Sequence, residues 1–163
     1  GAFFIDGYSS AGNILSGRLL GAKEYDTLLS LGKKLIGYGL SAGIFLAGIG
    51  FLCYEFIGEV FIQDRSVLQR FYEIFWIILI MQPICAITFI FDGMFKGMGY
   101  TAFLRNLLLL STLLVFIPSL LIFDAYNYKL EGVWFTFLLW ILARGIPLLL
   151  KFRRKFLPLV EKK

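Results

Sequence analysis

The chain has 163 residues, of which 59% are hydrophobic and only 17% are charged, and its formal net charge at pH 7 is +5. An ordinary soluble domain is less apolar, and one of this length could not hide so much apolar surface, because small domains leave much of their surface in water. This composition excludes a soluble globular domain and predicts an integral membrane protein.

Five apolar segments each approach the roughly 20 residues that a helix needs to cross the hydrocarbon of a bilayer. They span residues 1–20, 35–57, 72–95, 103–122 and 132–150. We therefore predict an all-α, polytopic membrane helical bundle of about five transmembrane helices over residues 1–152, with antiparallel neighbours and a basic tail at 153–163. The first residues already read as membrane helix without the basic leader of a signal peptide, so we expect a fragment of a longer protein.

The first segment carries a polar face. Asp6 is followed by Ser9, Ser10 and Asn13 at helical spacing. Asp6 lies roughly 20 Å from the cytoplasmic end of this helix at 1.5 Å per residue. An ionisable residue at such a depth is by default functional, so this face is predicted to line a water-filled substrate or ion pathway. Alternatively, Asp6 meets water at the outer end of the helix.

Small residues predict close helix contacts in three segments. Gly39 and Gly43 lie one turn apart in the second segment, and the pairs Gly17 with Gly21 and Gly93 with Gly97 have the same spacing. The stretches "GRLLGAKEY" (17–25) and "GMFKGMGYT" (93–101) are also alike, and each of their helices holds an Asp-Gly pair. The first and third segments are thus predicted to occupy related positions in a pseudo-symmetric bundle.

The third segment contains Pro83, preceded by Gln82 and followed by Thr88. Proline removes a helical hydrogen bond and frees a carbonyl, which predicts a kink. The kink either shapes a substrate cavity with Gln82 and Thr88 or belongs to a merely bent packing helix.

Ionisable residues also occur near the ends of the predicted helices. Asp92 precedes Lys96 by one helical turn, an order that favours an ion pair. The pair is interpreted either as an anchor at the cytoplasmic rim, with the lysine stem snorkelling, or as a gating or coupling element. Glu73 and Arg144 are expected to anchor their helices at the interface.

The basic residues predict the orientation of the chain. Thirteen of the sixteen Lys and Arg residues fall on one side of the predicted membrane: Arg18, Lys23, Lys33, Lys34, Lys96, Arg105, Arg144, Lys151, Arg153, Arg154, Lys155, Lys162 and Lys163. The positive-inside rule places that side, and with it the tail, in the cytoplasm. We interpret the tail, with its interleaved Phe152 and Phe156, as a headgroup-level anchor rather than a patch for anionic lipid or nucleic acid, and expect no nucleic-acid partner.

The chain offers little for metal or enzyme chemistry. It has two cysteines, Cys53 and Cys85, which lack the spacing of metal ligands, and no histidine. Without histidine, the commonest general base is missing. We therefore expect no structural metal site, no cofactor and no enzyme activity.

The segments "FFIDGYSSAGNILSGRLLGAKEYD" and "QPICAITFIFDGMFKGMGYTAFLRN" resemble two signature regions in the C-terminal lobe of the multidrug and toxic compound extrusion (MATE) transporters. The resemblance is strongest to the bacterial subgroup related to the DNA-damage-inducible membrane protein. The residues that match by motif are Asp6, Gly17, Arg18, Gly21, Gln82, Pro83, Asp92 and Gly97, and Lys96 stands where many relatives have a basic residue. Cys85 stands where some branches have a carboxylate, which leaves the coupling ion open.

The resemblance implies the C-terminal part of a twelve-helix secondary active antiporter in the bacterial cytoplasmic (inner) membrane. Such a protein exports amphiphilic organic cations in exchange for H⁺ or Na⁺, by alternating access between two lobes. Its partners would be membrane lipid, the cations and the missing N-terminal lobe, without which the chain is not expected to transport. Two other readings are a flippase for lipid-linked saccharides from the same superfamily and a membrane scaffold without transport activity.

Overall fold

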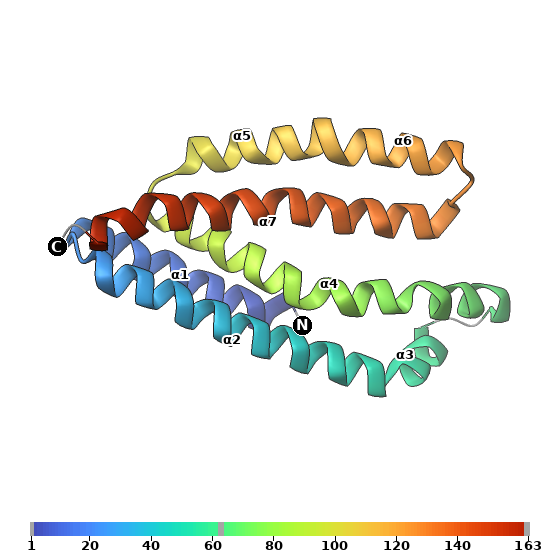
Figure 1. Ribbon diagram of the computed structural model, residues 1–163. Coiled ribbons are helices and arrows are strands. Elements are labelled where there is room, and N and C mark those ends of the chain that lie inside the picture. The colour runs from blue at the N-terminus through green and yellow to red at the C-terminus, as the bar shows by residue number, and fades with distance from the viewer. Residues whose placement is uncertain (1, 62–63, 162–163) are drawn as a thin grey trace.

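The computed structural model describes residues 2–61 and 64–161, and in these residues every regular element is a helix. In chain order the elements are α1 (Ala2–Gly21), α2 (Tyr25–Leu52), α3 (Tyr54–Phe61), α4 (Arg65–Gly97), α5 (Thr101–Ser111), the π-helix η1 (Thr112–Phe116), α6 (Ile117–Ala125) and α7 (Lys129–Glu161). Figure 1 shows α5 and α6 as one continuous rod. Residues 1, 162 and 163 of the predicted first helix and tail, and residues 62 and 63 of a predicted connection, lie outside the described part.

Four of the described helical segments are long and apolar enough to cross a membrane: Tyr25–Leu52, Arg65–Gly97, Thr101–Ala125 and Leu130–Val160. The first predicted span corresponds to α1, a helix of 20 residues that is not among these four. Its polar residues, which include Asp6 and Asn13, lower its hydropathy. The predicted all-α polytopic membrane bundle is confirmed.

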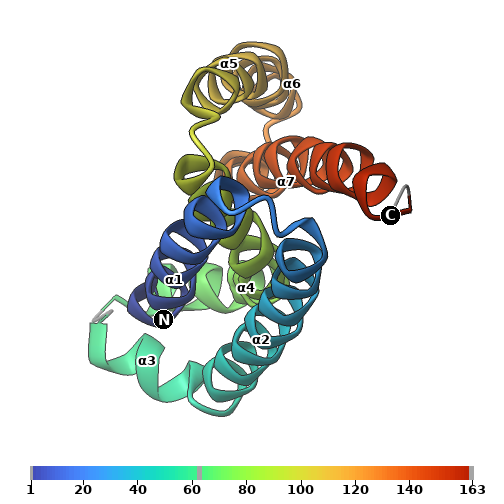
Figure 2. The same ribbon diagram turned by 90° about the vertical axis from the view of Figure 1, so that its left-hand side faces the viewer.

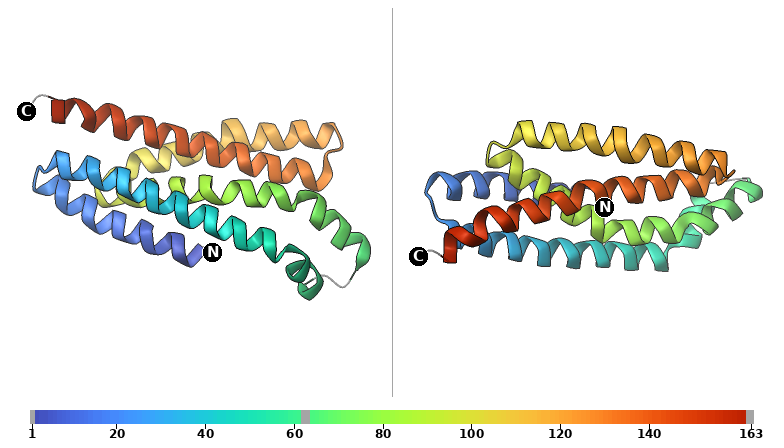
Figure 3. Two further views of the ribbon diagram at one scale, coloured as in Figure 1. Left: turned by 60° about the horizontal axis from the view of Figure 1, so that its bottom comes forward. Right: turned by 45° about the horizontal axis from the view of Figure 1, so that its top comes forward.

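The helices form a bundle in which α4 is central. It packs against α1 and α2 on one side and against α7 on the other, whereas the rod from α5 to α6 lies against α7 on the outside (Figures 1 and 2). The α1–α2 turn, the start of α5 and the end of α7 lie toward one end of the bundle, and α3 and the α6–α7 turn lie toward the other (Figure 3). We call the first of these the basic end, because it carries the predicted cluster of Lys and Arg.

Three helices extend further than the sequence predicts: α4, which begins at Arg65 instead of residue 72, and also α2 and α7. The stretch 21–34 was expected to be a polar connection, but α2 already begins at Tyr25. At the other terminus no separate tail starts at residue 153, because α7 continues to Glu161. The reason is burial: Phe152 and Phe156 are only 3% and 0% exposed, so these side chains pack in the core of the bundle and do not face the lipid.

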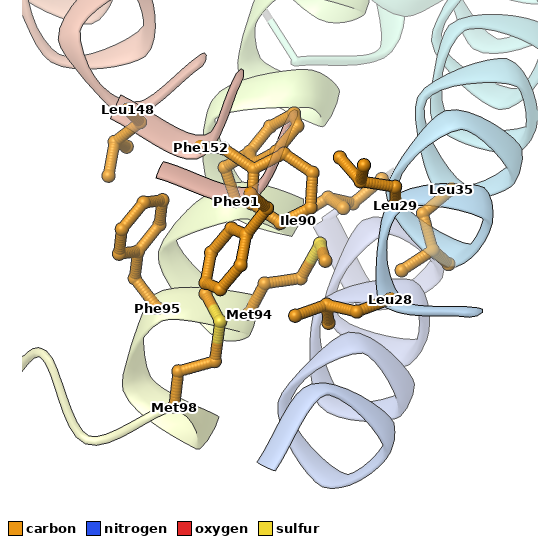
Figure 4. Close-up of a cluster of buried hydrophobic side chains, with 11 residues drawn as sticks. Leu28, Leu29, Leu35, Ile90, Phe91, Met94, Phe95, Met98, Leu148 and Phe152 are labelled. Carbon is orange, nitrogen blue, oxygen red and sulfur yellow. The ribbon is translucent and has the colours of Figure 1, made fainter. Parts of the chain in front are cut away.

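Side chains from α2, α4 and α7 converge in one hydrophobic cluster near the basic end (Figure 4). Its buried members are Leu28, Leu29, Leu35, Ile90, Phe91, Met94, Phe95, Met98, Leu148, Phe152 and Phe156. A second, smaller cluster joins α4 to α7 through Ile77, Met81 and Ile141. In lipid, dense packing rather than exclusion of water holds helices together, so these two clusters fix how α4 and α7 sit against each other.

Local chemistry explains where α4 begins and ends. Asp64 caps its first turn, because the Ser66 amide donates a hydrogen bond of 2.8 Å to Asp64 Oδ1. Hydrogen bonds from the Ser66 hydroxyl and amide hold the pKa of Asp64 below its usual value. At the other end Gly99 has a φ of +81°, a left-handed conformation that glycine adopts without strain. The turn to α5 follows directly.

Candidate functional site where helices α1, α4 and α7 meet

The backbones of α1 and α4 lie in direct contact along a row of glycines. A Cβ atom on Gly17 would be 2.6 Å from the carbonyl oxygen of Gly97. A Cβ atom on Gly93 or Gly97 would overlap the carbonyl oxygen of Ser9 or Asn13. Only glycine fits at such a separation, so these residues set the distance between the two helices.

Hydroxyl groups of α1 strengthen this contact. Ser9 Oγ donates a hydrogen bond of 2.8 Å to the Phe89 carbonyl, and the buried Ser16 donates one of 2.9 Å to the Met94 carbonyl. Ser9 and Asn13 therefore lie at a packed helix interface, not on a water-filled cavity wall as their spacing with Asp6 suggested. The predicted polar face is therefore split into two parts. Ser9 and Asn13 lie in the interface, whereas Asp6 and Ser10 are exposed on the surface of the bundle.

Asp6 lies near the middle of the bundle along its long axis. α1 begins partway along α2 (Figure 3), and the neighbouring Tyr8 stacks on Tyr38 of α2 with ring centroids 6.3 Å apart. Arg18 and Gly21, by contrast, are exposed near the basic end, where Arg18 lines a pocket of about 320 Å³ between α1 and α2. A Cβ atom on Gly21 would meet nothing within 4 Å, so the close helix contact predicted there is wrong. Asp6 thus lies near the middle of the bundle with an exposed side chain, and its depth in the bilayer stays a prediction.

The predicted kink region is packed against neighbouring helices. A Cβ atom on Gly43 would be 2.6 Å from Pro83 Cα, so α2 lies directly on the bend of α4, and one on Gly39 would overlap the Ile90 side chain. The buried Thr88 donates to the Ile84 carbonyl at 3.0 Å. A Cβ atom on Gly145 would be 2.5 Å from Thr88 Oγ1.

Pro83 therefore contacts α2 and Thr88 contacts α7, which matches the bent packing helix rather than the walls of a cavity. Gln82, next to Pro83, is partly buried.

Asp92 lies in a charge cluster that links α4 to α7. Arg144 Nη2 donates a hydrogen bond of 3.0 Å to Asp92 Oδ2, and Lys96 Nζ lies 3.5 Å from the same oxygen. The side chains of Arg144 and Asp92 are only 10% and 14% exposed, while that of Lys96 is 56% exposed. The predicted pair between Asp92 and Lys96 is present, but the principal partner of Asp92 is Arg144.

The cluster extends from Arg144 to the π-helix. The Arg144 guanidinium lies 4.9 Å from the centroid of the Trp140 ring, and Trp140 Nε1 donates a hydrogen bond of 3.1 Å to Thr112 Oγ1. Thr112 is the first residue of η1. A chain of polar contacts thus runs from α4 through α7 to the rod formed by α5 and α6.

A pocket of about 270 Å³ adjoins the cluster between α4, α5 and α7. Its lining consists of Asp92, Lys96, Thr101, Leu104, Arg105, Leu108 and Arg144. Three basic side chains thus face one carboxylate that is already paired. In this arrangement Asp92 neutralises a buried arginine, and both charges have a partner.

Comparison with known proteins identifies the family. The MatE family model matches residues 1–121, about three quarters of the chain. The chain belongs to the multidrug and toxic compound extrusion (MATE) family. It is similar to Protein DETOXIFICATION 42 from Arabidopsis thaliana, with 28% identity over 145 residues that make up 86% of this chain and 27% of that protein. This MATE chain therefore spans about a quarter of the length of the curated relative it matches. No solved structure matches it.

The family predicted from the two signature regions is confirmed, and with it a multi-pass membrane protein. The bacterial subgroup remains a prediction. In this MATE chain, sequence reasoning was wrong about Arg144, which is buried and paired instead of anchored at the interface. The sequence signal that was missed is its position as a lone cation with apolar residues on both sides, which by default marks a paired or functional group.

Within the described residues, no three His, Cys, Asp or Glu side chains gather in a way that could hold a metal ion.

Proposed function

We propose that the chain is the C-terminal part of a MATE-type secondary active antiporter that exports amphiphilic organic cations in exchange for protons or sodium ions. The match of the MatE family model to residues 1–121 supports this function above all. Alternating access requires a second lobe, so the chain acts within a longer protein and does not transport alone. We place it in the bacterial cytoplasmic membrane because of its resemblance to the bacterial subgroup. The distribution of Lys and Arg supports a cytoplasmic C-terminus.

Asp6 is the residue that we assign to the pathway. It is a carboxylate near mid-depth of the bundle, and it is exposed on the side of α1 that does not touch α4. A negative charge at this depth attracts a cationic substrate or a coupling ion, and Ser10 on the same side offers a hydroxyl beside it. The paired Asp92 is less suited to this task, because a substrate would have to displace Arg144.

We assign the cluster of Asp92, Lys96 and Arg144 to gating. The ion pair ties α4 to α7, so any rearrangement that separates these helices must break it or move it as a unit. Gly17, Gly93 and Gly97 let the backbone of α1 pack directly on that of α4, so these two helices are joined as well. The two contacts together make α1, α4 and α7 a unit that can move against the other lobe.

The alternatives predict different behaviour. A flippase for lipid-linked saccharides belongs to the same superfamily, but the family model that matches is MatE, which favours the exporter. A scaffold without transport activity predicts that substitution of Asp6 has no effect on efflux.

The test is efflux of a fluorescent organic cation by the intact transporter that contains this chain. Asp6→Asn removes the negative charge with little change in volume, and we expect efflux to fall at least about tenfold because the pathway loses its charge at mid-depth. Asp26→Asn is the matched control, since Asp26 is an exposed carboxylate at the start of α2. Unchanged efflux by Asp6→Asn at every pH and sodium concentration would contradict the assignment.

A further inference from the structure

A groove at the basic end separates the start of α5 from the second half of α7. It has a volume of about 480 Å³ and is lined by Phe103 of α5 and by Pro147, Leu150, Lys151, Arg154 and Lys155 of α7. The α7 residues are spaced by three or four positions, so they lie on one face of that helix. This groove is separate from the pocket beside Asp92.

The lining changes character along α7. Pro147 and Leu150 come first and are apolar, while Lys151, Arg154 and Lys155 follow toward the end of the helix. The candidate membrane span in α7, Leu130–Val160, has 31 residues and includes these basic ones. At 1.5 Å per residue it is about 46 Å long, which exceeds the roughly 30 Å of bilayer hydrocarbon. Basic side chains favour the headgroups over the hydrocarbon, so we expect the end of α7 to rise to the headgroups, with the basic part of the groove at phosphate level and the apolar part among acyl chains.

Aromatic rings hold the ammonium groups in place. Lys151 Nζ lies 3.3 Å from the ring centroid of Phe103, and Lys155 Nζ lies 4.1 Å from that of Tyr100 and contacts its hydroxyl. A cation over a ring face keeps hydrogen-bond donors available on its other side. Among the side chains that the structure describes, both ion pairs go to Asp92, and none reaches Lys151, Arg154 or Lys155.

We propose that this groove binds one anionic phospholipid. Lys151, Arg154 and Lys155 hold its phosphate, and one acyl chain lies along Phe103, Pro147 and Leu150. Charge complementarity supports this occupant, because the groove presents three cations that form no ion pair with any carboxylate in the described part of the chain. The sequence of lining residues along α7 also supports a lipid, because a soluble anion has no acyl chain that could pack against the apolar half of the groove.

The proposal is tested by native mass spectrometry of the intact protein, released from nanodiscs that contain phosphatidylcholine and phosphatidylglycerol. The variant Lys151→Gln, Arg154→Gln, Lys155→Gln should retain phosphatidylglycerol at least about tenfold less, since each cation near an anionic lipid is worth roughly fivefold in binding. The control is Lys23→Gln, Lys33→Gln, Arg153→Gln, which removes the same charge from exposed residues outside the groove near the same end. Equal losses in both variants would overturn the proposal, because general surface charge would then explain retention.

A second variant keeps all charges. Leu150→Trp fills the apolar part of the groove, and its side chain position is 46% exposed, so the fold has room for the larger ring. We expect it to lower retention of phosphatidylglycerol severalfold without changing the melting temperature in lipid-free detergent. Retention equal to wild type would exclude an acyl chain in the groove. Displacement of the lipid by millimolar glycerol 3-phosphate would show a site for a soluble anion and would equally overturn the proposal.

Discussion

Arg144 reaches across from α7 to Asp92 on α4, where both side chains are largely removed from solvent. A buried charge is costly alone and tolerable when paired, so the loss of one partner costs more than the replacement of both. Lys96 cannot take over from Arg144 fully, because it is more exposed and its ammonium lies further from Asp92 Oδ2. The pair should therefore behave as one unit in mutagenesis.

Arg144→Met is predicted to lower the free energy of unfolding by about 3 kcal/mol, at the low end of the range for breaking a buried pair because Lys96 remains near Asp92. The double variant Arg144→Met, Asp92→Leu removes both charges and should recover most of this loss. Thermal unfolding of the purified protein in one detergent provides the measurement. If the double variant is the sum of the two single losses, Asp92 and Arg144 do not interact.

Of the two ion pairs in this cluster, the sequence predicted only the one between Asp92 and Lys96. Asp92 and Lys96 are one helical turn apart, so their pairing follows from helix geometry alone. Arg144 is 52 residues from Asp92, and its approach depends on how closely α7 packs on α4. The separation of α4 and α7 is set by the contact of Gly145 with Thr88, and no local sequence pattern reveals this contact.

At the scale of the helices, glycine spacing was the most informative pattern. Gly17, Gly93 and Gly97 lie where α1 and α4 touch, and Gly43 lies on Pro83 where α2 crosses the bend of α4. Helix boundaries were less predictable. Polar residues suggested a connection before residue 35 and a tail after residue 152, but amphipathic helices continue through both stretches with Leu28 and Phe156 buried.

The α1–α4 contact yields a prediction with a built-in control. Gly97→Ala places a methyl group against the Asn13 carbonyl, and we expect a loss of about 1–3 kcal/mol through overpacking. Gly7→Ala, on α1, is the control. Its methyl group would have no atom within 4 Å, and we expect it to stabilise α1 by about 0.5–1 kcal/mol because alanine has a higher helix propensity than glycine. Melting temperatures of the two variants should move in opposite directions. Equal shifts would show that α1 and α4 are not in contact at Gly97.

For the molecule as a whole, the arrangement of the helices makes the orientation testable. Ser30 lies on α2 toward the basic end, and Gln69 lies on the first turns of α4 toward the opposite end; both are exposed. The positive-inside rule places Ser30 on the cytoplasmic side and Gln69 on the other. All-helical architecture and family followed from composition and two motifs, but sidedness rests on charge alone.

Single cysteines at these positions, in a background without Cys53 and Cys85, provide the measurement. A membrane-impermeant maleimide added to intact cells should label Gln69→Cys and should label Ser30→Cys only after the membrane is permeabilised. The parent without cysteines controls for background labelling. The reverse pattern would mean that the chain is inverted in the membrane.

The bend of α4 has a mechanical consequence. Pro83 stands between the two hydrophobic clusters, with Ile77 and Met81 on one side of it and Ile90 to Met98 on the other. Proline leaves the helix without one backbone hydrogen bond at this point, which makes it the most compliant place in α4. At this point α2 contributes only the backbone of Gly43 to the contact with Pro83. Both clusters also include residues of α7, Ile141 in one and Leu148, Phe152 and Phe156 in the other, so a tilt of either half of α4 at Pro83 must carry the adjoining part of α7 with it.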